Sequence, residues 1–339
     1  MPDTKISAFP AATSLSASDV IPVVQGGINK KADFTLFGYL PVTASIYVDA
    51  SGSDSTGTRG RADKPFLTIS AAKAVAVSGD VIIVGPGTFT ENSGITLPSG
   101  VSLIGAGADV TIITSTLTGL TNCVLVPGSG SVIMGITVSD TVSGGAPALG
   151  AGASDTAFSV AFVYRCKFVG KSPTVYVNKT GTDGLRVYDS IINSTSDAVI
   201  CSFGTHYFFN CDATSSGSAV VDHNFICAGG TIRIYGGLLT TSGALSGKRC
   251  LETSGGNIEA YNLRIVRDAT NPGYDALNTS GTLKLDDVVK VDNSPLSTSG
   301  LVTQLGVAGL MDAIITSGDI NNPEVMFDHD GTAMLHLTS

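Results

Sequence analysis

The most informative pattern in this chain is a motif that recurs along most of its length. A bulky apolar or aromatic residue is followed, in most copies, by Gly, Asn or Asp, and then by a stretch in which apolar and polar residues alternate. Nine copies begin at Val84-Gly85, Ile104-Gly105, Met134-Gly135, Tyr164-Arg165, Tyr188-Asp189, Phe209-Asn210, Tyr235-Gly236, Tyr261-Asn262 and Leu285-Asp286. They lie 20 to 30 residues apart. A repeat of this period predicts a solenoid, in which one structural unit is coiled many times along an axis.

The positions that follow the first residue of each copy, here called the anchor, alternate in character. The fourth residue after the anchor is apolar in the last seven copies, whereas the third is mixed. Because side chains of a strand alternate between its two faces, the second and fourth positions are expected to point inward. The residue directly after the anchor is Gly, Asn or Asp in eight of the nine copies. These residues adopt left-handed backbone at low cost, which predicts a sharp corner.

A second, weaker repeat marks another strand in the later coils. It consists of Thr174-Val175, Ala198-Val199, Ala219-Val220, Cys250-Leu251 and Ala276-Leu277. Two recurrent strands in each coil, joined by loops of variable length, predict an all-β solenoid of the parallel β-helix type.

The repeat is preceded by two regions of different character. Residues 1–43 lack it, and Gly26-Gly27 between two extended stretches predicts a tight hairpin. This segment is too short to bury much core alone, so it is expected to need a partner. Residues 44–80 form an opening module in which Pro65–Val77 has helical spacing. A short helix is expected there, capping the open end of the coil.

The coils themselves are predicted over residues 81–294, so the β-helix as a whole covers residues 44–294. From about Pro295 the repeat is lost, and Glu324 to Leu337 has the character of a terminal strand. Residues 295–339 are expected to form a C-terminal cap or a subunit-contact region.

Charge and hydropathy argue against two kinds of partner, nucleic acids and membranes. The net charge is −9 and the pI about 4.8, whereas a nucleic-acid-binding protein needs a basic face. No apolar run is long enough to cross a membrane, and the N-terminus has no apolar signal-peptide region. We expect assembly in a cytoplasm, with no nucleic acid as partner and no membrane insertion.

The six cysteines do not indicate a metal site. None forms a Cys-x-x-Cys pair or has a histidine cluster beside it, so neither a metal nor a cofactor is expected. Cysteine packs as a small hydrophobic residue, and apolar strand residues surround each of them. Buried free thiols are therefore expected at Cys123, Cys166, Cys201, Cys211, Cys227 and Cys250.

Two stretches resemble known protein families. The first runs from Ile46-Tyr47-Val48-Asp49 through Lys64-Pro65-Phe66 to Ile104-Gly105-Ala106-Gly107. It resembles the opening coils of pectin-lyase-like proteins, which are right-handed parallel β-helices. The second, Ile6 to Ala32, resembles the virion-attachment segment of bacteriophage tail fibres and tailspikes. Together they imply a right-handed parallel β-helix with a short N-terminal capping helix and a small N-terminal attachment segment.

The second resemblance implies a place in a phage particle. Such proteins are usually homotrimers that join the tail through the N-terminus and turn the β-helix toward the host surface. The attachment residues would be Asp19, Ile21, Val23, Gln25, Gly26, Gly27 and Lys30.

Some β-helix proteins of this kind cleave polysaccharides with exposed carboxylates, and one constellation here suits that chemistry. Glu252, Glu259 and Asp286 lie on adjacent coils, and glycoside hydrolysis needs two carboxyl groups at a defined separation. The alternative is that they are solvated surface carboxylates opposite Arg249, Arg264 and Arg267. We favour this alternative, because a fold alone does not carry a function. A polysaccharide lyase would instead need Arg or Lys as its base.

Two columns of side chains are predicted along the coils. Arg186, Tyr207, Arg233 and Glu259 each lie two residues before an anchor, and would form either a glycan-binding stripe or an ion-pair and cation–aromatic ladder at a subunit contact. The anchors Tyr164, Tyr188, Phe209, Tyr235 and Tyr261 form the other column. Core packing or a subunit interface is favoured for them over a sugar-stacking track, because five exposed aromatic residues would make a large apolar patch.

The sequence favours a structural or adhesion component of a phage particle, most simply a trimeric tail fibre or tailspike, located in the virion. The first alternative is a small tailspike polysaccharide depolymerase, either a glycoside hydrolase or a polysaccharide lyase. The second is a capsid decoration or cement protein. His206 and His223 lack partners at diagnostic spacing and are expected to be ordinary strand or loop residues.

Overall fold

The computed structural model describes most residues between 44 and 305, together with four short strands outside that span. The described residues are 20–25, 28–33, 44–140, 144–171, 173–217, 222–242, 248–267, 274–291, 296–300, 302–305, 324–327 and 333–336. The chain divides into two compact units, Met1–Thr43 and Ala44–Ser339.

The described part of the first unit is a β-hairpin. Strand β1 (Val20–Gln25) pairs antiparallel with β2 (Ile28–Asp33), so that Gln25 lies opposite Ile28 at the turn. This confirms the predicted hairpin. Of the predicted attachment residues, Ile21, Val23, Gln25 and Lys30 lie on these strands, with Val23 opposite Lys30. Asp19, Gly26 and Gly27 lie outside the described residues.

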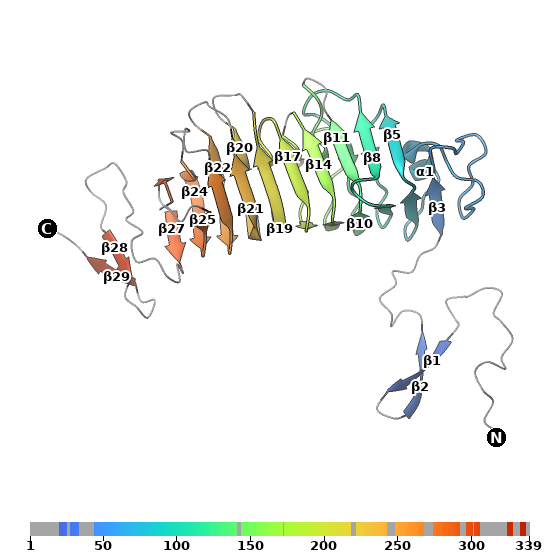
Figure 1. Cartoon of the computed structure of the whole chain (residues 1–339), viewed down its shortest axis with the longest axis horizontal. Coiled ribbons are helices and arrows are strands. Elements are labelled where there is room, and N and C mark those ends of the chain that lie inside the picture. The colour runs from blue at the N-terminus through green and yellow to red at the C-terminus, as the bar shows by residue number, and fades with distance from the viewer. Residues whose placement is uncertain are drawn as a thin grey trace. The chain divides into compact units, whose positions relative to one another are not determined.

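The second unit is a parallel β-helix with three strands in most of its coils, rather than the two that were predicted. Strands of successive coils pair in parallel and in register, and the coils follow one another along one axis (Figure 1). The three resulting ladders are named the anchor face, the second face and the third face. The coiling is right-handed, as the resemblance implied.

The anchor face contains the strands that end at or next to the anchors. Its strands are β3 (Ser45–Val48), β4 (Val81–Val84), β7 (Ser102–Gly105), β10 (Ser131–Met134), β13 (Ala161–Tyr164), β16 (Leu185–Tyr188), the first parts of β19 (Thr205–Ser215) and β21 (Thr231–Thr241), the last parts of β22 (Arg249–Tyr261) and β24 (Ala276–Asp286), and β27 (Val302–Leu305).

The second face follows the corner after each anchor. Its strands are β5 (Gly87–Glu91), β8 (Thr111–Ser115), β11 (Thr137–Asp140), β14 (Lys167–Gly170), β17 (Ile191–Ser194), the last parts of β19 and β21, β23 (Arg264–Arg267) and β25 (Val289–Lys290).

The third face corresponds to the weaker repeat in the sequence. Its strands are β6 (Ile95–Thr96), β9 (Leu125–Val126), β12 (Leu149–Ala151), β15 (Val175–Val177), β18 (Val199–Cys201), β20 (His223–Cys227), the first parts of β22 and β24, and β26 (Thr298–Ser299). Val199 pairs with Phe225 in this ladder, whereas Ala219-Val220, where the repeat was predicted, lie outside the described residues.

The predicted corner directly after the anchor is present at the third to eighth anchors, whereas in the first two coils positive φ occurs at Gly87 and Gly107 rather than at Gly85 and Gly105. Arg165, Asp189, Asn210 and Asn262 have φ near 50°, and Gly135 and Gly236 also have positive φ. Arg165 adopts the same left-handed backbone as its Asp and Asn equivalents, although it is neither Gly, Asn nor Asp. The geometry of the coil therefore imposes the corner even where the residue type does not favour it.

Two predicted anchors were one residue out of register. Ile83, not Val84, pairs with Ile104, and Asp286, not Leu285, pairs with Tyr261. Val84 and Leu285 are core residues, almost completely buried. In the last coil the left-handed residue is consequently Asp287, with φ 52°. The predicted inward residue Val289 is half-exposed for the same reason.

One short helix closes the first coil, as predicted. Helix α1 covers Ile69–Ala74, which is shorter than the predicted Pro65–Val77. Its N-cap is Thr68, whose hydroxyl accepts a hydrogen bond from the Ala71 amide. In the preceding loop, the Leu67 and Thr68 amides donate hydrogen bonds to the Asp54 carboxylate. Ile69 and Ala72 are buried in the end of the core, so the helix covers apolar surface that a solenoid end would otherwise expose.

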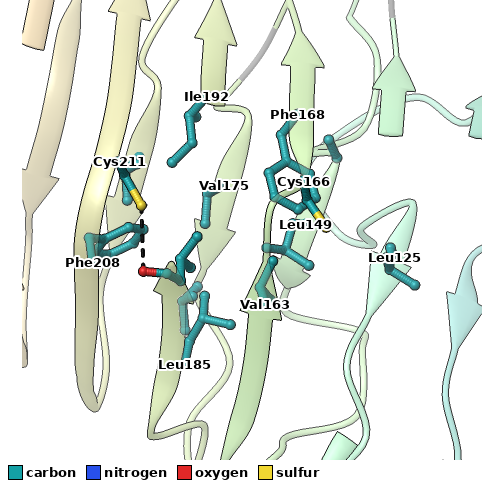
Figure 2. Close-up of a cluster of buried hydrophobic side chains, with 14 of the residues drawn as sticks. Leu125, Leu149, Val163, Cys166, Phe168, Val175, Leu185, Ile192, Phe208 and Cys211 are labelled. Atoms are coloured by element: carbon teal, nitrogen blue, oxygen red, sulfur yellow. Dashed lines mark hydrogen bonds between the residues drawn. The ribbon is translucent and has the colours of Figure 1, made fainter. Parts of the chain in front are cut away.

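The core lies inside the three faces and is built as columns of similar residues. From Met134 to Tyr261, the fourth residue after each anchor points inward as predicted; Val138, Phe168 and Ile192 are examples. Figure 2 shows aliphatic, phenylalanine and cysteine side chains from successive coils packed against one another. All six cysteines are free and buried, as expected. Burial raises the pKa of Cys166 to about 11, so its thiol is not a reactive thiolate.

The parallel ladder continues past its predicted end at residue 294. Strand β26 pairs with the start of β24, and β27 pairs with the end of β24, so the last coil reaches Leu305. Beyond it, β28 (Glu324–Phe327) and β29 (Ala333–His336) form an antiparallel pair where a single terminal strand was expected. Within the described ranges, no helix is long and apolar enough to cross a membrane.

Candidate binding face

A continuous column of charged and aromatic side chains runs along the outside of the anchor face. Parallel pairing places the predicted column members on successive strands and adds one residue at each end. The column, named the cation ladder, consists of Phe162, Arg186, Tyr207, Arg233, Glu259 and Lys284. The residues next to it in each strand are buried in the core, so the ladder points outward.

Neighbouring members of the cation ladder are in contact. The Arg186 guanidinium carbon lies 5.5 Å from the ring centres of both Phe162 and Tyr207, so the cation is held between two aromatic rings. The Arg233 guanidinium carbon lies 5.7 Å from the ring centre of Tyr207, and Arg233 Nε donates a hydrogen bond to Glu259 Oε2 at 2.9 Å. The Lys284 ammonium lies 5.4 Å from the Tyr261 ring centre.

The aromatic anchors form a second column beside the ladder. Ring centres of Tyr164 and Tyr188 are 4.8 Å apart, and the following pairs are 4.6, 5.0 and 5.0 Å apart, with planes within 14° of parallel. This aromatic stack contains Tyr164, Tyr188, Phe209, Tyr235 and Tyr261. The core residues of the same strands are instead Val163, Val187, Phe208, Ile234 and Ala260, all fully buried. The interpretation of the anchors as core residues was therefore wrong.

The geometry of the stack decides what it can bind. Each inner ring has both faces covered by its neighbours, and the ring planes of Phe162 and Tyr207 are nearly parallel to those of Tyr164 and Phe209. The surface therefore presents ring edges and tyrosine hydroxyl groups, while few ring faces remain. A sugar ring could therefore stack on a free aromatic face only at the ends of the stack. Burial, the largest effect, raises the pKa of Tyr164 and Tyr235, so these hydroxyls remain protonated donors at neutral pH.

The charges along the ladder are not uniformly neutralised. The pKa of Glu259 is lowered chiefly by its hydrogen bond with Arg233, and the Tyr261 hydroxyl donates to the same carboxylate at 3.1 Å. By contrast, among the residues described here, no carboxylate lies within ion-pair distance of Arg186 or Lys284. The ladder therefore carries a local excess of positive charge on a chain whose net charge is −9.

The structure does not bring the three predicted catalytic carboxylates together. Glu252 lies on the third face, and Glu259 lies on the anchor face beyond the bend at Gly255, where φ is 139°. Asp286 pairs with Tyr261 at the edge of the anchor face. Only Glu259 and Asp286 share a face, because Glu252 belongs to the other part of the same long strand.

A second group of charged residues, not predicted from the sequence, lies where the third-face strands begin. His223 donates to Asp197 and contacts Glu252, with both nitrogen–oxygen distances at 2.7 Å. Arg249 also pairs with Glu252, which confirms one predicted partner, although both side chains are mostly buried rather than solvated. Ion pairs further along the same edge join Lys248 to Asp222 at 3.5 Å and Arg267 to Asp275 at 2.8 Å. These residues are named the charged seam.

In the charged seam, the pKa of His223 is raised and the pKa of Glu252 is lowered. Burial of His223 opposes its protonation, but Asp197 and Glu252 outweigh burial, and the pKa of His223 is raised. Burial of Glu252 likewise opposes ionisation, but His223 and Arg249 together lower its pKa. His206 behaves as the expected structural histidine: it accepts from the Leu185 amide, and burial lowers its pKa.

Some of the site residues that were not predicted could have been found from the sequence. Phe162 lies two residues before the anchor Tyr164 and completes the ladder by the same rule that found Arg186. Lys284 was lost because the last anchor was placed one residue early. The charged seam was missed because the weaker repeat was aligned on Ala219-Val220, so the register that pairs His223 with Arg249 was not found.

The three-dimensional similarity of the chain to solved structures is confined to its fold. Pectin methylesterase from carrot matches with a TM-score of 0.56 over 78% of this chain and 83% of its own, at 17% identity. Pectin methylesterase from Aspergillus niger matches with a TM-score of 0.55 over 80% of this chain and 88% of its own, at 16% identity. No protein-family model and no curated protein matches the sequence. The chain is thus a parallel β-helix protein with the fold of the pectin methylesterases.

Proposed function

We propose that this protein is a structural and adhesion component of a bacteriophage particle. The segment 1–43 attaches it to the virion, and the β-helix presents a binding face to the host surface. The observation that carries this proposal is the outward anchor face, where aromatic rings and cations repeat in register over successive coils. Tyrosine and arginine are the side chains that most often dominate the binding energy of recognition surfaces.

The state of the two glutamates supports binding rather than hydrolysis. A glycosidase needs one carboxyl group that stays protonated near neutral pH, with a raised pKa. In both residues the pKa is lowered instead, because Glu252 contacts His223 and Arg249 and Glu259 contacts Arg233. Neither is therefore suited to act as a general acid.

The phage assignment and the trimeric state rest on the resemblance of Ile6 to Ala32 to virion-attachment segments. The described hairpin β1–β2 falls within that stretch and gives it an ordered element of its own. In this proposal the N-terminal segment contacts a tail protein, three copies assemble into one fibre or spike, and the assembled protein resides in the virion.

The test is to locate the protein in intact particles and to count its copies. Immunogold labelling is expected at the tail, with a copy number divisible by three. A variant lacking residues 1–43 is expected to remain folded, since the β-helix is a separate compact unit, but to be absent from particles. Labelling spread over the shell would favour a capsid decoration protein, and absence from particles would refute the proposal.

A polysaccharide depolymerase is the second candidate. The shared fold favours it, because the solved structures with a similar fold include pectin methylesterases, whose name describes action on a polysaccharide. The purified protein should be incubated with host surface glycan, and product size followed by chromatography. Depolymerisation that is abolished by Glu252→Ala or Glu259→Ala would establish the enzyme. Unchanged glycan length with retained binding supports adhesion.

A further inference from the structure

We propose that the cation ladder binds a linear acidic glycan, with Arg186 as its principal carboxylate contact. This inference rests on the proposed adhesion function and adds the chemical class of the ligand and the residues that hold it. Arg233 and Lys284 would provide the further anion contacts along the same column.

Arg186 has the features of an anion site. Its guanidinium is fixed between the rings of Phe162 and Tyr207, which restricts its rotamers before any ligand arrives. Aromatic rings cover its two faces, so its N–H donors, which lie in the guanidinium plane, remain the groups available for hydrogen bonding. No carboxylate of the described residues pairs with it, in contrast to Arg233. A ligand carboxylate can therefore form the bidentate contact that the protein leaves unmade.

The order of residues along the ladder fits a polymer with charge at regular intervals. Cations occupy alternate rungs: Arg186, Arg233 and Lys284 are each separated by one intervening strand. Since neighbouring strands lie about 4.8 Å apart, the cations recur roughly every 10 Å. An extended glycan with one carboxylate in each disaccharide unit has charges on this scale. The intervening rung at Tyr207 offers a hydroxyl to the uncharged sugar.

The same charges disfavour a sister subunit as the occupant. In a cyclic assembly whose axis is parallel to the β-helix and runs beside the cation ladder, each ladder residue at the axis lies near its own copies. Arg186 would then meet Arg186, and Lys284 would meet Lys284, which costs free energy. A polyanion of nucleic acid is also disfavoured, because three cations on a chain of charge −9 make too small a basic surface.

The shape of the face indicates how the glycan would be recognised. The inner rings of the aromatic stack have no free faces, so stacking contributes little for a neutral sugar. Affinity must then come from the cations and from hydrogen bonds with tyrosine hydroxyls. Binding is therefore expected to depend on ligand charge and to weaken as salt is raised.

The experiment uses the full-length protein and three defined glycans. Hyaluronate fragments carry a carboxylate on alternate sugars, polygalacturonate carries one on every sugar, and the methyl ester of polygalacturonate has the same backbone without charge. Calorimetry or surface binding is expected to show binding to the two acidic glycans, tightest for hyaluronate, and at least about tenfold weaker binding to the ester.

The variants are chosen so that charge can be separated from folding. Arg186→Gln is expected to weaken binding of the acidic glycans about tenfold or more. Arg186→Lys keeps the charge but loses the planar fork, and is expected to fall between the wild type and Arg186→Gln. Arg264→Ala removes one positive charge from an exposed position on the second face and is expected to bind as the wild type does. Circular dichroism checks that each variant is folded.

Three outcomes would overturn the inference. They are equal binding of the ester and the acid, equal weakening by Arg186→Gln and Arg264→Ala, or loss of the oligomer in Arg186→Gln with glycan binding unchanged. The last outcome would assign the ladder to a subunit contact. None of these results bears on where the protein lies in the particle, so failure of this inference is distinguishable from failure of the proposed function.

Discussion

The anchor face and the charged seam are built on the same coils but use their charged residues in opposite ways. On the anchor face, Arg233 is 34% exposed and its partner Glu259 28% exposed. In the seam, the side chains of Lys248 and Asp222 are both 0% exposed. The anchor face keeps its charges accessible to solvent and to a ligand, whereas the seam uses charge to connect loops of neighbouring coils in the protein interior.

The difference teaches where a solenoid can hold a binding surface and where it holds structural ion pairs. Strand residues repeat at the same height in every coil, so an outward column becomes a continuous surface. At the strand starts and in the loops before them, charged residues instead pair individually, as His223 does with Asp197 and Glu252. A buried charge without its partner is costly, and an exposed one is not.

The largest expected effect distinguishes the two regions directly. Asp222→Ala leaves the Lys248 ammonium buried without its ion-pair partner, and should reduce the free energy of unfolding by about 3–5 kcal/mol. Glu259→Gln also removes the partner of a cation, but Arg233 keeps access to water, so a loss below about 1 kcal/mol is expected. Denaturant titration measures both. Equal losses would show that burial does not separate the two regions.

A smaller effect is expected from breaking the aromatic stack. Phe209 lies between two rings, so Phe209→Ala should cost about 1–3 kcal/mol for the two stacked pairs, in addition to lost burial. Tyr261 ends the stack, and Tyr261→Ala should cost about half as much for stacking. Unfolding midpoints compare the two variants. A larger loss for Tyr261→Ala would mean that the stack does not act as a series of pairwise contacts.

The third prediction compares how one histidine of the seam and one of the core make the stability of the protein depend on pH. The pKa of His223 is raised on folding by Asp197 and Glu252. Its contribution is complete below the unfolded pKa of about 6.5 and is lost as pH rises through the folded pKa. The pKa of His206 is lowered by burial, so its contribution is lost as pH falls below about 6.5.

Urea unfolding at several pH values between 5 and 9 tests this pair, with His223→Gln and His206→Gln as variants. Relative to the wild type, the His223 variant should lose most stability at the acidic end of the series. The His206 variant should compare most favourably with the wild type at that same end. The same pH dependence in both differences would contradict the assignment of the two protonation states.

The smallest effect tests the corner that joins the anchor face to the second face. Arg165 has φ 50°, where Asn is better tolerated, so Arg165→Asn should stabilise the protein by about 0.5 kcal/mol. Arg165→Ala has the same backbone restriction and should give no gain. Thermal unfolding measures the difference, and equal stability of the two variants would show that the left-handed corner carries no strain.

The sequence predicted the parts of the molecule that repeat on strands. The solenoid, the hairpin, the capping helix and the predicted members of the cation ladder follow from periodicity and turn residues, because parallel pairing in register converts sequence spacing into spatial columns. The errors lie where the pattern is weakest. Leu285 was taken as an anchor because it is apolar, whereas the position is occupied by Asp286.

The charged seam was not predicted, because the repeat of the third face is weak and was aligned on Ala219-Val220. In the structure His223 and Arg249 pair in register at the starts of β20 and β22. Asp197 and Asp222 lie in the loops before β18 and β20, where sequence spacing does not show which charges meet. The outward direction of the aromatic stack was equally open, since the left-handed corner at each anchor separates the faces of the strands before and after it.

The aromatic stack also provides an intrinsic spectroscopic probe of the anchor face. The chain has no tryptophan and nine tyrosines, and five of those tyrosines lie in the aromatic stack or beside it on the anchor face: Tyr164, Tyr188, Tyr207, Tyr235 and Tyr261. Near-ultraviolet dichroism and tyrosine emission therefore arise largely from this one surface, and rings about 5 Å apart are close enough to couple electronically. A glycan, a sister chain or a receptor that covered the face would change a signal that needs no added dye.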